Sequence, residues 1–217
     1  MMRMVLGLSR LAQLVFVALA TLSLAQKTDS AKLPRPQMDG GRPLMQVLKD
    51  RKSTRSFSEK PIAAQVLSNL LWAAFGVNRP ELGKRTAPSA MDSQEIDIYV
   101  AKEDGVFLYE AKGHALLPIL KEDIRTKIGG PEFVKKAPVS LIFVADYAKM
   151  KKAKEDQKPF YSAIDAGCVS QNVYLFCASE NLGTVVHDGC DKRNLPRLMG
   201  LRPDQKIILG QCVGYPE

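Results

Sequence analysis

The chain has 217 residues, of which 46% are hydrophobic and 25% are charged, and its formal net charge at pH 7 is +8. This composition excludes a collagen-like or mainly disordered chain, and the length is sufficient for a real hydrophobic core. The positive charge would suit nucleic acid, an anionic membrane or an anionic cofactor, or it forms a solvated basic surface. We find no nucleic-acid-binding module and therefore expect no nucleic-acid partner.

Residues 1–25 have the pattern of a signal peptide. They hold two arginines and no acidic residue, an apolar run from 11 to 22, and the small-x-small sequence Ser23-Leu24-Ala25. The apolar run is shorter than the roughly 20 residues that a membrane-spanning helix needs. We therefore predict an exported protein, periplasmic or secreted. An uncleaved leader that anchors the chain in a membrane is the alternative.

Residues 26–41 are polar and rich in proline and glycine, and we predict a linker there. Residues 42–217 are predicted to form one domain, and we find no internal repeat and no low-complexity run in the chain. Export would permit disulfides among the four cysteines, but we favour four small buried hydrophobic side chains. There is no CxxC motif and the chain has only two histidines, so we expect no metal site. The cysteines are Cys168, Cys177, Cys190 and Cys212.

The first half of the domain contains an amphipathic helix and a hairpin. Apolar residues recur at helical spacing from 63 to 74, in a helix that Ser58 could cap. In residues 95–101, the apolar residues Ile96, Ile98 and Val100 occupy every second position, as in a half-buried strand. The turn that follows would return the chain as the second strand of a hairpin. Shorter helical pieces are predicted at 44–50, 116–120 and 132–136.

The second half contains a buried strand and the longest helix. Residues 139–145 form a continuous apolar run, which is typical of a strand in the centre of a sheet. Residues 161–180 are predicted as a helix whose apolar residues cover much of its circumference, so it should be buried. Asn181-Leu182-Gly183 would end that helix with a C-terminal glycine. A strand at 184–187, a helix at 193–199 and a strand at 206–213 follow. This order indicates an α+β fold with a central mixed or antiparallel sheet flanked by helices.

Two segments in the first half carry groups that suit an anionic, flat ligand. The sequence Arg51-Lys52-Ser53-Thr54-Arg55 places three cations and two hydroxyls within five residues. Its guanidinium groups could converge on one phosphate, with Ser53 adding a hydrogen bond, although a solvated basic loop is the alternative. In the segment 85–94, Pro88, Ser89 and Ala90 would let the backbone approach a flat ring, and Asp92 supplies a carboxylate. Taken alone, that segment could be any turn before a strand.

Two further segments lie near the end of the chain. His187-Asp188-Gly189 follows a short predicted strand, and its glycine would permit a close approach to a ligand. A main-chain amide there could face a ring nitrogen. The alternative is an ordinary loop in which Asp188 or Asp191 caps the next helix. The fourth segment is Val213-Gly214-Tyr215-Pro216, at the end of the last predicted strand.

In this order and spacing, the four segments resemble the nitroreductase family over roughly residues 43–216. The resemblance implies a nitroreductase-like α+β homodimer that holds two FMN molecules at its interface. By the same match, Arg51, Ser53 and Arg55 would hold the FMN phosphate and ribityl chain, with Lys52 contributing through its backbone. Pro88, Ser89 and Ala90 of the partner subunit would line the flavin ring. Asp188 and Gly189 would lie beside flavin N5, with a main-chain amide as the donor.

The resemblance also has departures. Family members often carry Asn where this chain has Asp92, and a less polar residue where it has His187. His187 could therefore touch the flavin or a substrate, or be a surface histidine.

The resemblance implies an FMN-dependent oxidoreductase. It would transfer hydride from NAD(P)H or another donor to a nitro, quinone or similar small acceptor, without a dedicated catalytic side chain. An exported flavin-binding or non-catalytic domain that keeps the fold without turnover is the alternative.

Overall fold

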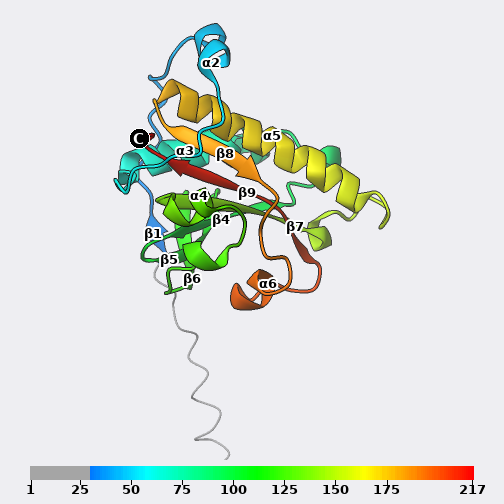
Figure 1. Cartoon of the computed structure of the whole chain (residues 1–217). Helices are drawn as coiled ribbons and strands as arrows, with labels where there is room; N and C mark the ends of the chain where they lie inside the picture. The colour runs from blue at the N-terminus through cyan, green and yellow to red at the C-terminus, as the bar shows by residue number, and fades with distance from the viewer. Residues whose placement is uncertain (1–29) are drawn as a thin grey trace, which may run out of the picture.

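The structure is a computed structural model that describes residues 30–217, so the expected signal peptide lies outside the described residues (Figure 1). Within these residues, seven strands form one sheet in the order β1-β6-β5-β4-β7-β9-β8, and every neighbouring pair is antiparallel. The strands are β1 (Ala31–Lys32), β4 (Ile96–Lys102), β5 (Gly105–Glu110), β6 (Ala115–Leu120), β7 (Val139–Asp146), β8 (Gly183–His187) and β9 (Gln205–Gly214). A separate hairpin pairs β2 (Val77–Arg79) with β3 (Lys84–Arg85).

Helices cover both faces of the sheet, which makes the molecule an α+β fold. Figure 1 shows α5 along one side of the sheet and α6 on the other. The α-helices are α2 (Leu44–Asp50), α3 (Ala64–Phe75), α4 (Glu132–Lys136), α5 (Lys158–Ser179) and α6 (Leu195–Leu198). Single 3₁₀ turns are η1 (Pro80–Leu82), η2 (Ala90–Asp92), η3 (Arg125–Lys127) and η4 (Tyr147–Lys149).

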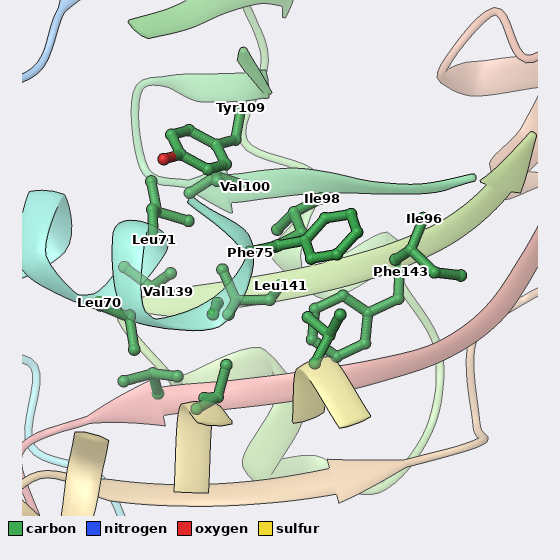
Figure 2. Close-up of a cluster of buried hydrophobic side chains, with 14 of the residues drawn as sticks. Leu70, Leu71, Phe75, Ile96, Ile98, Val100, Tyr109, Val139, Leu141 and Phe143 are labelled. Atoms are coloured by element: carbon green, nitrogen blue, oxygen red, sulfur yellow. The ribbon is translucent and has the colours of Figure 1, made fainter. Parts of the chain in front are cut away.

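The central strand β7 explains why two apolar clusters form. All eight of its residues are buried, because helices or loops cover it on both sides. Alternate side chains point to opposite faces of a strand, so Leu141 and Phe143 pack with α3 and α5. On the other face, Ile142 and Val144 pack with buried residues of α4 and α6 and with Ile124 and Ile128, which flank η3. Figure 2 shows the first cluster, in which Phe75 of α3 lies against the β4 and β7 side chains.

Most predicted elements are present, and the helix at 44–50 has the predicted bounds. The helix predicted at 116–120 is wrong, because Ala115–Leu120 is strand β6, paired antiparallel with β5 and β1. A six-residue apolar run shows no period that separates helix from strand, and the ladder with β5 satisfies its backbone groups. The last helix is shorter than the predicted 193–199.

Both predicted helix caps differ from the structure. Ser58 donates its amide to the Tyr215 carbonyl, and α3 begins after Ala63 with no side-chain cap. At the end of α5 the left-handed residue is Asn181, with φ 56°, rather than the glycine. Gly183 instead begins β8, where a Cβ would lie 2.8 Å from the Thr54 side chain. The glycine is therefore used for close packing.

The long helix α5 is buried on the side that faces the sheet and exposed on another. Phe160 and Ile164 are 66% and 48% exposed, so the expectation of burial around much of the circumference is only partly correct. Cys177, Cys190 and Cys212 are buried free thiols, as expected for small hydrophobic side chains. Cys168 is half-buried and also free.

From Ala31 onwards, the segment that we predicted as a linker is attached to the domain. Strand β1 pairs with β6, and Leu33 donates its amide to the His114 carbonyl at 3.1 Å. Farther along, the Ser68 hydroxyl donates to the Pro34 carbonyl, and the Arg42 amide to the Ser179 hydroxyl. None of the helices in residues 30–217 is long and apolar enough to cross a membrane.

Candidate functional site

A tyrosine of α5 joins the first and third predicted segments at the edge of the sheet. The Tyr174 hydroxyl lies 3.0 Å from the Ser53 hydroxyl and accepts the Val186 amide of β8 at 3.0 Å. One residue further, Thr54 donates its amide to the Thr184 carbonyl at 2.9 Å. The basic loop is therefore attached to the free edge of β8, directly before the turn that follows that strand.

The cations of this loop are available to an anion. The Arg51 guanidinium lies over the Tyr174 ring, 5.3 Å from its centroid. Lys52 and Arg55 are exposed. Among residues 30–217, none of these three cations forms an ion pair with a carboxylate. Guanidinium groups bind phosphate through strong charge-assisted hydrogen bonds, so the loop fits a phosphate group.

The fourth segment supports the far end of the same loop. Phe57 forms a bridge with Pro216, and the Tyr215 carbonyl accepts the Ser58 amide at 2.9 Å. A Cβ on Gly214 would lie 3.1 Å from the Phe57 ring, so the glycine leaves room for that ring. This segment therefore has a structural role in the described chain: it holds the loop against β8 and β9.

The turn at 187–189 is supported from behind by a pair of glycines. Gly129 and Gly130 have φ values of 91° and 89°, a left-handed backbone that favours glycine. A Cβ on Gly189 would lie 2.6 Å from the Gly130 Cα, so the two backbones are in direct contact. The Asp191 amide donates to the Ile128 carbonyl at 2.7 Å. The backbone of the turn is thereby fixed, while Asp188 is exposed.

The side chain of His187 lies behind this turn. It is 9% exposed, so the alternative of a surface histidine is wrong. Its ring packs edge-on against the Phe133 ring, with 6.4 Å between the two ring centroids. Within residues 30–217, neither ring nitrogen of His187 has a hydrogen-bond partner. Burial lowers the pKa of His187, partly offset by the charge of Asp188, so the ring is neutral at pH 7. The imidazole packs under the turn as an uncharged group.

The loop between the turn and α6 is held by a carboxylate. Asp191 accepts the amides of Arg193 and Asn194 through Oδ1, at 3.0 and 3.1 Å. These bonds lower the pKa of Asp191, together with the side-chain hydrogen bond from Asn194, which is the largest cause. Of the two aspartates proposed to cap the next helix, Asp191 is the one that binds these amides.

The second predicted segment lies elsewhere in the same chain. The Ala90 amide donates to Asp165 Oδ2 of α5 at 2.7 Å, and the Ser89 hydroxyl accepts the Gln94 amide at 2.9 Å. Asp92 pairs with Lys84, whose hydrogen bond holds the pKa of that carboxyl below its usual value. Asp92 is therefore occupied by a neighbouring cation.

The second segment and the basic loop contact different parts of α5. Asp165 contacts Ala90, and Tyr174 contacts Ser53. These two helix residues are nine positions apart, which corresponds to about 13 Å of rise and half a turn of rotation. A single chain therefore does not bring Pro88, Ser89 and Ala90 to the basic loop.

Three contacts of this site were not predicted from the sequence. Tyr174 lies in the helix that we predicted to be buried and received no role in the site, and neither Asp165 nor the pair Gly129 and Gly130 was singled out. Only the Gly-Gly-Pro sequence at 129–131 is a local signal, since it marks a turn with unusual backbone angles.

Comparison with known proteins decides the family. A profile of the nitroreductase family matches residues 48–215. The chain belongs to the nitroreductase family. A solved structure from Ralstonia eutropha JMP134, classed as a nitroreductase, superposes with a TM-score of 0.83. The match has 40% identity and covers 87% of this chain and 90% of that one. The resemblance inferred from the four segments is thereby confirmed, and so is the fold.

Two curated relatives support the same assignment. A protein from Methanocaldococcus jannaschii, also classed as a nitroreductase, is 34% identical over 152 residues, which are 65% of this chain and 76% of the relative. An NAD(P)H-dependent FMN reductase from Bacillus subtilis is 26% identical over 184 residues. That alignment covers 78% of this chain and 64% of the reductase.

Proposed function

We propose that this nitroreductase-family protein is an FMN-dependent oxidoreductase that works as a homodimer. It would take electrons from NAD(P)H or another donor and pass them to a nitro, quinone or similar small acceptor. Membership of the family supports an FMN-type oxidoreductase, and the Bacillus subtilis FMN reductase supports the cofactor and the donor. The observation that carries the proposal is the basic loop, which is fixed beside the 187–189 turn. Among residues 30–217, none of its three cations forms an ion pair with a carboxylate.

The residues present fit FMN at both of its ends, the phosphate and the ring. Arg51 and Arg55, with Ser53, would hold the phosphate and the ribityl chain. The backbone of Asp188 and Gly189, pressed against Gly130, would offer an amide to the ring at a fixed position. When bound, FMN supplies the redox chemistry, and the chain's own residues bind and orient it.

The homodimer is supported by the part of the site that one chain lacks. Pro88, Ser89 and Ala90 would reach the basic loop from the partner subunit. Apolar side chains that a partner would cover are exposed on α2 and α5. They are Leu44, Met45, Leu48, Phe160 and Ile164.

Removing both loop arginines tests the phosphate site. The double variant Arg51→Ala, Arg55→Ala should purify without FMN, and its circular dichroism spectrum should stay that of the wild type. A matched control is Lys112→Ala with Lys121→Ala, two exposed cations at either end of β6, which lies near the opposite edge of the sheet. Equal FMN affinity in the arginine variant and the wild type would show that the phosphate binds elsewhere.

Turnover separates the enzyme from a flavin-binding protein without activity. Oxidation of NAD(P)H in the presence of a nitroaromatic or quinone acceptor would support the oxidoreductase. A yellow protein that shows no turnover with any donor would support the flavin-binding alternative. Export stays a prediction from residues 1–25.

A further inference from the structure

Residues 33–37, which we call the strap, are attached to α3 and to the turn between β5 and β6. Leu33 donates its amide to the His114 carbonyl at 3.1 Å, and the Pro34 carbonyl accepts the Ser68 hydroxyl at 2.6 Å. The second half of the strap is bonded to two amide side chains of α3. The strap is thus held by a few hydrogen bonds, and those at its beginning involve His114 or its partner Ser68.

Three side chains form a continuous chain of hydrogen bonds beside the strap. His114 Nε2 lies 2.7 Å from the Ser68 hydroxyl, and His114 Nδ1 lies 3.0 Å from the Tyr109 hydroxyl. The one hydroxyl hydrogen of Ser68 goes to the Pro34 carbonyl, so Nε2 carries a hydrogen and donates it to Ser68. A neutral imidazole has a single N–H group, so Nδ1 accepts from Tyr109. Each of these hydrogens has an acceptor while the ring is neutral.

A second proton on His114 would disturb this arrangement. Nδ1 would become a donor facing the Tyr109 oxygen, and the phenol hydrogen would lose its acceptor. Within residues 30–217, the Tyr109 hydroxyl has no other hydrogen-bond partner, and the side chain is only 6% exposed. A buried donor without an acceptor and a partly buried charge both cost free energy. Accordingly, burial lowers the pKa of His114, and the Pro34 carbonyl opposes this only in part.

The charged groups around His114 offer an imidazolium little compensation. Within residues 30–217, no carboxylate forms an ion pair with its ring. The acid of β5 is Glu110, whose carboxylate accepts the amides of Lys112 and Gly113 in the turn. Helix α3 and strand β6 contain no titratable residue. The cations on the neighbouring elements are Lys32 of β1, Arg35 of the strap, Arg85 of β3 and Lys112 of the turn.

We propose that His114 is a pH-sensitive switch, whose neutral ring keeps the strap on the domain and whose protonation detaches it. This inference goes beyond the proposed function and does not depend on it. With the strap detached, the ring lies in water and takes up a proton near pH 6.5, whereas the attached ring resists the proton. The attached strap is therefore most stable above about pH 6.5, and its stability falls as the pH decreases. Because the strap precedes α2, acid would free the chain in front of that helix.

Hydrogen exchange at the Leu33 amide measures how often the strap is detached. In the full chain, its protection, corrected for the intrinsic exchange rate, should decrease by up to about tenfold from pH 7.5 to pH 5.5. That limit applies when only the detached ring, with its ordinary pKa of about 6.5, takes up the proton. The amide of Ile142 in the central strand β7 should keep its protection over the same range.

Two variants separate the switch from a purely structural role. His114→Asn removes the titratable ring, and asparagine tolerates the left-handed backbone of this position, where φ is 49°. This variant should lose the pH dependence at Leu33, whatever its protection at pH 7.5. Asn69→Ala is the control, because it removes the side chain that accepts the Gln37 amide and leaves the ring intact. It should lower the protection at both pH values and keep the wild-type ratio between them.

Two results would overturn the proposal. One is an equal pH dependence of the Leu33 protection in His114→Asn and the wild type. The other is a parallel loss of protection at Ile142, since that would mean that acid unfolds the whole domain. Both measurements can be made with or without FMN, so a failure of the flavin function would not change their outcome.

Discussion

The hydroxyl of Tyr174 connects the basic loop to β8 through Ser53 and Val186, so its removal should weaken both stability and cofactor binding. Tyr174→Phe keeps the ring under Arg51 and removes the bonds to Ser53 and Val186. A buried amide left without a partner costs about 1–3 kcal/mol. Val186 is 37% exposed, so water can partly replace the hydroxyl, and we expect the low end, about 1–2 kcal/mol.

Urea unfolding of the protein without FMN measures the stability, and titration of flavin fluorescence measures the affinity. A loop that loses about 1.4 kcal/mol of its positioning energy would bind FMN about tenfold more weakly. Tyr161→Phe is the matched control, because Tyr161 lies on the same helix and its hydroxyl makes no hydrogen bond within residues 30–217. If the Tyr174→Phe and Tyr161→Phe variants behave alike in both assays, the hydroxyl does not organise the site.

Two further substitutions change Glu95, which is fully buried directly before β4, and Gly189 of the 187–189 turn. Burial raises the pKa of Glu95 from 4.5 to about 7 in the folded chain. Between these two pH values, the folded state therefore holds a proton that the unfolded state has released. Stability therefore falls as pH rises from about 4.5 to 7 and stays low above, and Glu95→Gln should be more stable than the wild type at pH 8, by about 2 kcal/mol in thermal or urea unfolding. Gly189→Ala would push a Cβ into the Gly130 backbone and should cost about 1–3 kcal/mol and most of the FMN affinity. Gly167→Ala is its control, because a Cβ there meets nothing within 4 Å in α5, and it should be neutral or slightly stabilising in the same unfolding assay.

Elements with a strong local pattern could be predicted from the sequence, and those without one could not. The strand at 139–145 is a continuous apolar run because both of its faces are covered, so its central place in the sheet could be predicted from the sequence. The run at 115–120 is also apolar, but its pairing with β5 and β1 makes it a strand. The end of α5 was predicted at the right place with the wrong residue, because the use of Gly183 depends on Thr54, far away in the sequence.

The candidate site shows the same division. The basic loop and the 187–189 turn were recognised by residue type, since clustered cations and a glycine turn suit a phosphate and a ring. The groups that position them are contacts between distant parts of the chain. A tyrosine such as Tyr174 in an apolar helix face is ordinarily a core residue, and only the folded chain places its hydroxyl between Ser53 and Val186.

Helix α2 connects cofactor binding with the proposed dimer. It is seven residues long and buries only Val47, whereas Met45 on the same helix is 76% exposed. An isolated helix of this length is unstable in water, so it needs packing that the described chain supplies only in part. The Arg51 amide donates to the Val47 carbonyl at 2.8 Å, so the first cation of the basic loop is attached to the last turn of this helix. In the proposed dimer, covering α2 would therefore also order the phosphate site, and a monomer would lack both that order and the partner's Ser89–Ala90 turn.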